Sequence, residues 1–155
     1  MVEEQLDREK ILHIALDKET EARDFYMQAV DLVKILGTKA LLRELAKMEQ
    51  GHIDLITKAL ETGVVETIGR PVEIQDIRLS DYLIPEEQIT NKSTSQDIMT
   101  IAIQREARAE KFYTDFAGSF QGSDVESLFR RLAGEESNHR GWLEKEYEDV
   151  YMKEM

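Results

Sequence analysis

Residues 15–26 read ALDKETEARDFY and residues 45–52 read LAKMEQGH, and both stretches return 87 residues later as AIQREARAEKFY and LAGEESNH. Each copy holds one Glu that is followed 30 residues later by Glu-x-x-His. The matched residues are Glu19, Glu49 and His52 in the first copy and Glu106, Glu136 and His139 in the second. The repeat indicates a duplicated unit, and its period and copy number differ from those of a solenoid.

The spacing within each copy predicts a metal site. Glu-x-x-His places its two side chains on one face of a helix, one turn apart. Two antiparallel helices per copy would bring the lone Glu beside that pair, within about a turn of the same level at a rise of about 1.5 Å per residue. Two copies that face each other supply four carboxylates and two imidazoles, which is a ligand set for two metal ions.

The residue types favour oxygen and nitrogen coordination. Carboxylates bind one metal or bridge two, and imidazole suits iron, zinc, copper and nickel. The absence of cysteine excludes disulfides, thiolate zinc sites and iron–sulfur clusters. A single Glu in so acidic a chain is usually solvated, and a lone Glu-x-x-His is more often a surface pair. However, two of the three histidines occur in matched contexts, and the helical phase buries their Glu partners, where unpaired carboxylates are costly.

Composition bounds the class of protein. The 155 residues suit one domain over 1–155, and 41% apolar and 34% charged residues with only two prolines favour long helices. The net charge of −12 argues against nucleic acid and against an anionic membrane surface. The charged N-terminus has no apolar signal region, and no apolar run approaches the ~20 residues that span a bilayer. We therefore expect a cytoplasmic protein with neither nucleic-acid nor membrane partners.

Periodicity predicts four helices in two hairpins. Apolar residues at a period of 3.6 indicate helices over about 6–36 and 39–61, with Gly37 and Thr38 breaking between them and Thr38 as an N-cap. Hairpin 1 thus covers about residues 6–62. Residues 63–93 contain Pro71 and Pro85 and predict an extended crossover, whose length suits a link between the ends of parallel helices.

Two capping boxes predict the second hairpin, at about residues 94–153. The third helix begins near Ser93 or Thr94, with Ser93-x-x-Gln96 as a capping box, and runs to about Phe120. Ser123-x-x-Glu126 begins the last helix. The last helix runs toward the C-terminus and becomes very charged in its final turns.

Tyr26 and Tyr113 each follow the lone Glu of their copy by seven residues, two turns along the same helical face. One interpretation is a phenol that hydrogen-bonds a ligand carboxylate or tunes redox chemistry. The other is an aromatic residue of an amphipathic core. The sequence favours neither.

The four quoted segments resemble the rubrerythrin branch of the ferritin-like superfamily, and the resemblance covers nearly the whole chain. It implies an all-α, ferritin-like four-helix bundle made of two helical hairpins joined by a long crossover, with a non-haem di-iron centre. By motif, the implied ligands are Glu19, Glu49, His52, Glu106, Glu136 and His139. Members of the family commonly reduce hydrogen peroxide, and many associate as homodimers.

Two features depart from the family pattern. Rubrerythrins typically carry a rubredoxin domain with four cysteines, so a chain without cysteine needs a separate electron donor, such as a rubredoxin. They also have an extra Glu one turn after the first ligand of the third helix, where this chain has Ala109 followed by Glu110. The symmetric six-ligand set is similar to ferritin and bacterioferritin sites as well.

The leading hypothesis is a non-haem di-iron carboxylate oxidoreductase that reduces hydrogen peroxide in the defence against oxidative stress. Two iron ions per chain share a two-electron change, while the four ligand Glu hold the metals and shift position with oxidation state. The alternatives are a ferroxidase or iron-handling protein that uses dioxygen, and a non-enzymatic metal-binding helical module. Manganese fits the same ligands as iron.

Overall fold

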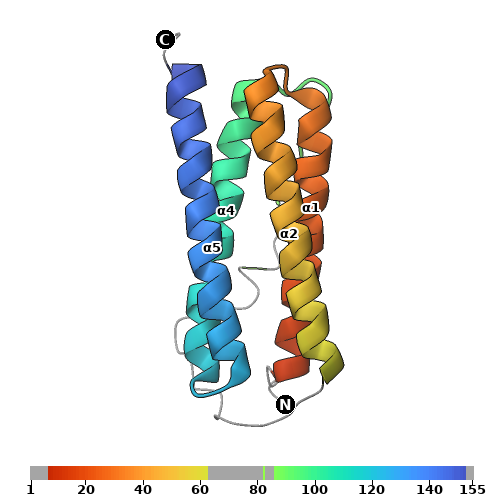
Figure 1. The fold of residues 1–155 in the computed structure, drawn as a ribbon, viewed down its shortest axis with the longest axis vertical. Helices are drawn as coiled ribbons and strands as arrows, with labels where there is room; N and C mark the ends of the chain where they lie inside the picture. The colour runs from red at the N-terminus through yellow and green to blue at the C-terminus, as the bar shows by residue number, and fades with distance from the viewer. Residues whose placement is uncertain (1–6, 63–81, 83–85, 153–155) are drawn as a thin grey trace, which may run out of the picture.

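The computed structural model describes residues 7–62, 82 and 86–152 (Figure 1). Within them, four long helices run along the long axis of the molecule, and no strand occurs. They are α1 (Arg8–Leu32), α2 (Leu36–Thr62), α4 (Ser95–Ala117) and α5 (Asp124–Glu146). The prediction of an all-α four-helix bundle is confirmed.

The helices form two antiparallel hairpins, α1 with α2 and α4 with α5 (Figure 1). In the bundle α1 packs beside α4, and α2 packs beside α5. The turn between α1 and α2 lies at the end of the bundle where α4 begins, so α2 and α4 run in the same direction. This is the arrangement of parallel helices for which the sequence predicts a long crossover. Residues 63–81 and 83–85 of the crossover lie outside the described residues.

The described part of the crossover packs on the bundle. Tyr82 is 9% exposed, and its ring makes edge contacts with Phe112 and Phe116 of α4. Its hydroxyl donates a hydrogen bond to Asp115. Ile89 is 3% exposed, and its carbonyl accepts a hydrogen bond from Gln28 of α1 at 3.2 Å. The crossover is thus attached to the face formed by α1 and α4.

The expected helix break at Gly37 and Thr38 is wrong. α1 ends at Leu32, because Val33 is in extended backbone with φ −78° and ψ 154°. α2 begins at Leu36, so Gly37 and Thr38 lie in its first turn. Thr38 is not an N-cap: it is 0% exposed, and its hydroxyl donates to Glu146 Oε2 at 2.6 Å. This tertiary contact with the end of α5 takes the place of the expected local one.

The N-cap of α4 lies one residue later than the capping box over Ser93 and Gln96 predicts. The Thr94 side chain accepts from the Asp97 backbone N–H at 3.0 Å, and the Asp97 carboxylate accepts from Thr94 N–H at 3.2 Å. The Ser93 hydroxyl instead accepts from the Thr90 N–H at 2.9 Å, within the preceding turn. Asp97 therefore takes the place of Gln96 as the residue whose side chain accepts from the N-cap backbone N–H.

The predicted start of the last helix is confirmed at Ser123, whose side chain accepts from the Glu126 N–H at 3.3 Å. The Glu126 carboxylate accepts from the Gly122 N–H at 2.9 Å, so its reciprocal bond goes to the residue before the cap. Gly122 has a φ of 81°, which glycine adopts readily. Beyond α5 the chain continues as a π-helical segment over Tyr147–Met152.

Two apolar clusters fill the bundle, one toward each end. The first uses residues of α1 that precede Glu19, such as Leu12, together with residues of α4 that follow Glu106, such as Phe112. The second uses residues of α1 that follow Glu19 and residues of α4 that precede Glu106. The level of Glu19 and Glu106 therefore lies between two apolar clusters, in the middle of the core.

Candidate metal centre

Six ionisable side chains, which we call the polar layer, occupy the level between the two apolar clusters. Every one of them is at most 2% exposed. Each helix contributes at least one member: Glu19 from α1, Glu49 and His52 from α2, Glu106 from α4, and Glu136 and His139 from α5. The structure thus brings together all six residues that the repeated motif singles out.

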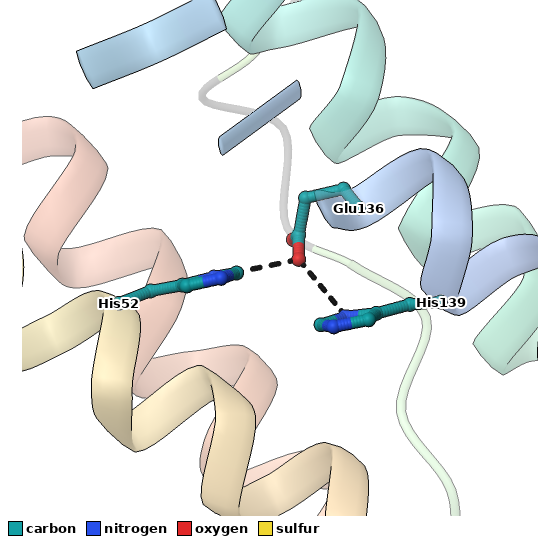
Figure 2. Close-up of side chains that lie close together, drawn as sticks. All are labelled: His52, Glu136 and His139. Carbon is teal, nitrogen blue, oxygen red and sulfur yellow. Dashed lines mark ion pairs between the residues drawn. The ribbon is translucent and has the colours of Figure 1, made fainter. Parts of the chain in front are cut away.

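The two histidines direct Nδ1 toward the centre of the polar layer. Figure 2 shows a carboxylate oxygen of Glu136 between the two rings, 3.5 Å from His52 Nδ1 and 3.1 Å from His139 Nδ1. The rings are almost parallel, with an interplanar angle of 6° and centroids 5.7 Å apart. Glu19 lies 3.2 Å from His52 Nδ1, and Glu106 lies 3.6 Å from His139 Nδ1.

The ligand atoms fall into two overlapping groups of four residues, in addition to a group of three that joins both histidines to Glu136. In each group, one oxygen or nitrogen from every residue lies within 4.8 Å of the others. One group is Glu19, Glu49, His52 and Glu136, and the other is Glu49, Glu106, Glu136 and His139. Glu49 and Glu136 belong to both groups of four, so each of these carboxylates lies close to both histidines.

Hydrogen bonding within the protein leaves this cluster unsatisfied. Among the described residues, several fully buried side-chain atoms have no hydrogen-bond partner, and most of them belong to the polar layer. These are both oxygens of Glu49, one oxygen each of Glu106 and Glu136, and Nδ1 of His139. Unpaired buried polar atoms are destabilising. The donor set is the one that hard or borderline divalent cations take, so the polar layer could hold a metal.

The electrostatics of the polar layer oppose four ionised carboxylates. Burial, followed by the charges of neighbouring Glu residues, raises the pKa of Glu49 and of Glu136 well above the usual value. Burial lowers the pKa of His139, but the carboxylates of Glu106 and Glu49 close to its ring outweigh burial and raise that pKa to about 10. The protein without metal therefore retains protons here that a divalent cation would replace.

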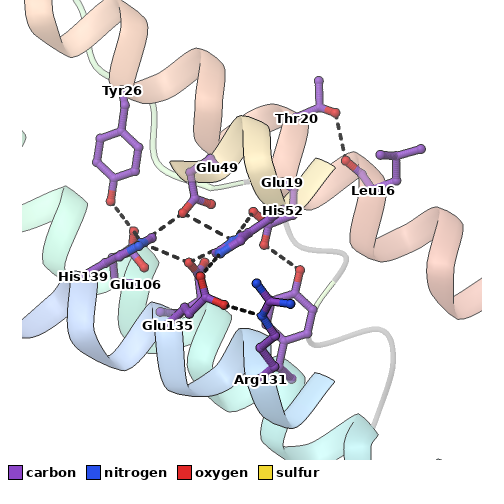
Figure 3. Close-up of polar contacts among 12 residues, drawn as sticks. Leu16, Glu19, Thr20, Tyr26, Glu49, His52, Glu106, Arg131, Glu135 and His139 are labelled. Carbon is purple, nitrogen blue, oxygen red and sulfur yellow. Dashed lines mark hydrogen bonds and ion pairs between the residues drawn. The ribbon is translucent and has the colours of Figure 1, made fainter. Parts of the chain in front are cut away.

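Two tyrosines connect the hairpins at the polar layer. The Tyr26 hydroxyl of α1 donates to Glu106 of α4 (Figure 3). The Tyr113 hydroxyl of α4 donates to Glu19 Oε1 of α1 at 2.6 Å. Burial and the adjacent carboxylates raise the pKa of both phenols well above the usual value, so both keep their protons. Each phenol holds a carboxylate of the opposite hairpin. These reciprocal bonds between hairpins cannot be inferred from the residue spacing within one helix.

Part of the chain matches a known protein family. The Rubrerythrin family model matches residues 97–155. The second hairpin is rubrerythrin-like. The resemblance to rubrerythrins inferred from the paired motifs is therefore confirmed over this part of the chain. Among curated proteins, no sequence matches the chain significantly.

Two solved structures share the fold. One is a dodecameric thioferritin, the bacterioferritin-related protein of Bacteroides fragilis, with 20% identity and a TM-score of 0.70 over 92% of this chain and 86% of that chain. The other is a hypothetical protein from Pyrococcus furiosus, with 24% identity and a TM-score of 0.67 over 92% and 89% of the two chains. The bundle is therefore ferritin-like. Across the described ranges, no helix has the length and apolar character to cross a membrane.

Glu110, the neighbour of the position where rubrerythrins carry an extra Glu, does not join the polar layer. Its carboxylate pairs with Arg140 of α5 at 2.6 Å, and its side chain is 29% exposed. Glu135, which sequence reasoning did not identify, reaches the site instead. Its Oε1 lies 3.1 Å from His52 Nε2, whereas Glu19 contacts the other ring nitrogen, Nδ1 (Figure 3). Its counterpart in the repeat is Met48, so the repeat gave no signal for it.

A cavity adjoins the polar layer between α1 and α4. Its lining includes Glu19, Tyr113 and Glu136, so it reaches the cluster itself. Ala22 and Ala109, which correspond in the repeat, also line it. Because Ala109 stands where rubrerythrins have the extra Glu, its small side chain leaves space beside the polar layer.

Basic side chains surround the outer part of the cavity. Lys18, Arg105 and Arg108 all line it, together with Glu86. The Arg108 side chain is 40% exposed and pairs with Glu86 at 3.1 Å, which places this part of the lining at the surface. Burial lowers the pKa of Lys18, and the Lys18 ammonium donates to the carbonyl of Tyr82. A small molecule that enters here meets these three cations together with Glu21 and Glu86, in a chain with a net charge of −12.

Proposed function

We propose that the chain is a non-haem di-iron carboxylate oxidoreductase that reduces hydrogen peroxide with electrons from a separate donor. The observation that carries the proposal is the pair of overlapping ligand groups, which share Glu49 and Glu136 and lie fully buried. A site for one ion would need neither the second histidine nor the second pair of carboxylates. The rubrerythrin match over residues 97–155 supports iron as the metal.

The proposed ligands divide by position in the bundle. Glu19 and His52 would hold one ion, and Glu106 and His139 would hold the other. Glu49 and Glu136 are shared between the two positions. Manganese fits the same oxygen and nitrogen set, so the choice of metal rests on the family resemblance.

Reduction of one hydrogen peroxide molecule to two water molecules consumes two electrons and two protons. Two bound iron ions would supply the two electrons together. The protein supplies the surroundings: the two apolar clusters exclude bulk water, and Tyr26 and Tyr113 hold Glu106 and Glu19 in place. The cavity between α1 and α4 provides a route for a small oxidant to the carboxylates.

The second candidate function is ferroxidase or iron handling, in which Fe(II) is the substrate and dioxygen the oxidant. The symmetric pair of ligand groups favours it, because neither position carries the extra rubrerythrin carboxylate, and Glu110 is engaged by Arg140. The fold shared with the thioferritin supports it as well. This function requires many iron ions to be oxidised per site, whereas peroxide reduction requires only two that stay bound.

Anaerobic titration of metal-stripped protein with Fe(II) is the first test, and we expect tight binding of two ions per chain. The reduced protein is then mixed with hydrogen peroxide or with dioxygen, and oxidation is followed by absorbance. Faster oxidation by peroxide than by dioxygen supports the peroxidase. The reverse order, with repeated Fe(II) turnover, would support the ferroxidase. Absence of tight binding of either Fe(II) or Mn(II) would leave a helical module without a metal centre.

We also propose that the chain assembles with copies of itself, as a homodimer. The thioferritin neighbour is dodecameric, so the mass of the assembly separates the two functions further. Native mass spectrometry that gives a dimer favours the peroxidase, because iron storage in a cage needs a large oligomer. Electron delivery is tested with a reduced rubredoxin as donor, since the chain has no cysteine with which to bind its own rubredoxin-type iron.

A further inference from the structure

The two histidines of the polar layer differ in what holds the far side of the ring. His52 Nε2 contacts Glu135 Oε1 at 3.1 Å, and Glu135 Oε2 accepts from Arg131 Nε at 2.9 Å (Figure 3). Within the described part of the chain, no carboxylate lies at the second ring nitrogen of His139. The ring of Trp142 packs against His139 instead, with centroids 5.5 Å apart.

The difference arises where the repeat is broken. An offset of 87 residues pairs His52 with His139, Glu49 with Glu136, and Met48 with Glu135. Met48 is partly buried and packs against the apolar cluster around Leu45. A thioether is a weak acceptor, so α2 cannot give His139 the support that α5 gives His52.

A carboxylate on the outer nitrogen of a ligand histidine has a known physical effect. It fixes the ring tautomer so that Nδ1 carries the free lone pair, it orients the ring, and it makes the ligand nitrogen more basic. Loss of such a partner typically lowers metal affinity by about 10–100-fold. Glu135 satisfies the geometric requirement, because it contacts Nε2 while Nδ1 faces Glu19 and Glu136.

We propose that Glu135 is a positioning residue that makes the two metal positions unequal. The position formed by Glu19 and His52 binds a divalent transition-metal ion more tightly than the position formed by Glu106 and His139. This inference rests on the proposed occupancy by two ions. Arg131 assists by holding the second oxygen of Glu135, which turns the first toward His52.

Stepwise binding of Co(II) tests the proposal, because its visible spectrum reports coordination and it is stable in air. We expect the metal-stripped wild-type protein to bind two ions in two distinguishable steps in calorimetry. Glu135→Gln should weaken the tighter step by about 10–100-fold and leave the other unchanged. His52→Ala should remove the tighter step and His139→Ala the weaker one, which assigns the steps to positions.

Two further variants test whether Glu135 acts by positioning His52 or only as part of a surface ion pair. Glu110→Gln is the matched control, since Glu110 also pairs with an arginine and has similar exposure, 29% against 35% for Glu135, but touches no histidine. It should leave both steps unchanged. Met48→Glu places a carboxylate at the corresponding site on α2 and should strengthen the weaker step. Circular dichroism of each metal-free variant establishes that the bundle is intact.

A spectroscopic reading is independent of affinity. In Zn(II)-loaded protein with ¹⁵N-labelled histidine, we expect the Nε2 proton of His52 to resonate downfield of that of His139, and the difference to vanish in Glu135→Gln.

Different results overturn different proposals. Two steps of equal affinity, or a Glu135→Gln variant that changes neither step or both equally, would overturn the role of Glu135 and leave the two-metal site standing. A wild-type protein that binds one ion or none would overturn the two-metal site, and the inequality with it.

Discussion

At the scale of single residues, the two tyrosines show how the polar layer is held before any metal enters. Burial opposes ionisation of Glu19, but hydrogen bonds, first from His52 and also from Tyr113, lower its pKa. Tyr113 is 1% exposed and donates to Glu19 at 2.6 Å from the other hairpin. The bond therefore connects a buried charged carboxylate to a buried donor, the class of hydrogen bond that contributes most to stability.

Tyr113→Phe should lower the free energy of unfolding of the metal-free protein by about 1.5–3 kcal/mol, because a charged buried acceptor loses its donor. Urea denaturation at neutral pH measures the change. Tyr147→Phe is the control: the Tyr147 hydroxyl accepts from Gln96 at 2.8 Å in an exposed contact, so the loss should stay within about 0.5 kcal/mol. Equal effects of the two substitutions would show that the phenol of Tyr113 serves only as packing.

At the scale of helices, the sequence predicted what periodicity and the repeat encode. Four helices and the six members of the polar layer follow from local spacing, because the ligands lie in the middle of helices, where an error at an end does not matter. The helix ends were less predictable. Threonine is a residue type that favours the N-cap position, yet the Thr38 hydroxyl bonds to Glu146, which is 108 residues away. Such a contact exists only after the bundle has formed.

The contributions from outside the repeat were also beyond sequence reasoning. Glu135 is one of 32 acidic residues, and only the packing of α5 against α2 places it on His52. The cross-hairpin bonds of the tyrosines depend likewise on how α1 and α4 lie together. Hydrophobic periodicity identifies which face of a helix is buried, but not which residue of a neighbouring helix it meets.

The face between α1 and α4 carries a prediction of its own. Ala109→Leu adds bulk to the cavity lining beside Glu19 and Tyr113, and should slow oxidation of the Fe(II)-loaded protein by peroxide several-fold. The number of Fe(II) ions bound should stay unchanged, because the substitution removes no ligand. Stopped-flow absorbance after anaerobic loading measures both. Ala107→Leu places the same side chain on α4 away from the cavity lining and should leave the rate unchanged; slowing by both variants would argue for general disturbance of the helix.

At the scale of the whole molecule, the polar layer that suits metal binding also lowers the stability of the metal-free bundle. Four carboxylates and two imidazoles occupy the core between two apolar clusters, and several of their atoms have no hydrogen-bond partner. A bound ion stabilises the folded state by an amount that grows with the logarithm of its free concentration, about 2.7 kcal/mol at 100 times Kd. We therefore expect the metal-loaded protein to unfold at a clearly higher temperature than the metal-free protein.

The pH dependence of the metal-free protein follows from the same layer. Glu49 and Glu136 have a pKa well above 4.5 in the folded protein, so each opposes folding increasingly as pH rises above its unfolded pKa. The pKa of His139 is raised from 6.5 to about 10, so protonated His139 stabilises the folded state fully below pH 6.5. This contribution is lost as pH rises through about 10. The effect of Glu19 on stability is opposite to that of Glu49 and Glu136. Its pKa is lowered, so it adds stability that is lost only as pH falls below 4.5. Between about pH 5 and 9, stability should therefore fall as pH rises.

The double substitution Glu49→Gln with Glu136→Gln should separate stability from metal binding. Neutral amides carry no charge that burial opposes, so the metal-free variant should be more stable than the metal-free wild type at pH 8. The gain should be at most about 1–4 kcal/mol, the range for replacement of buried ion pairs by well-packed apolar residues. Its stability should also vary less between pH 5 and 8. Because both shared carboxylates are lost, Co(II) should no longer stabilise the folded variant.

Urea denaturation at the two pH values, with and without Co(II), measures all three effects. A variant that is less stable than the wild type at pH 8 would mean that the carboxylates support the metal-free fold, and a retained response to Co(II) would mean that Glu49 and Glu136 are not ligands.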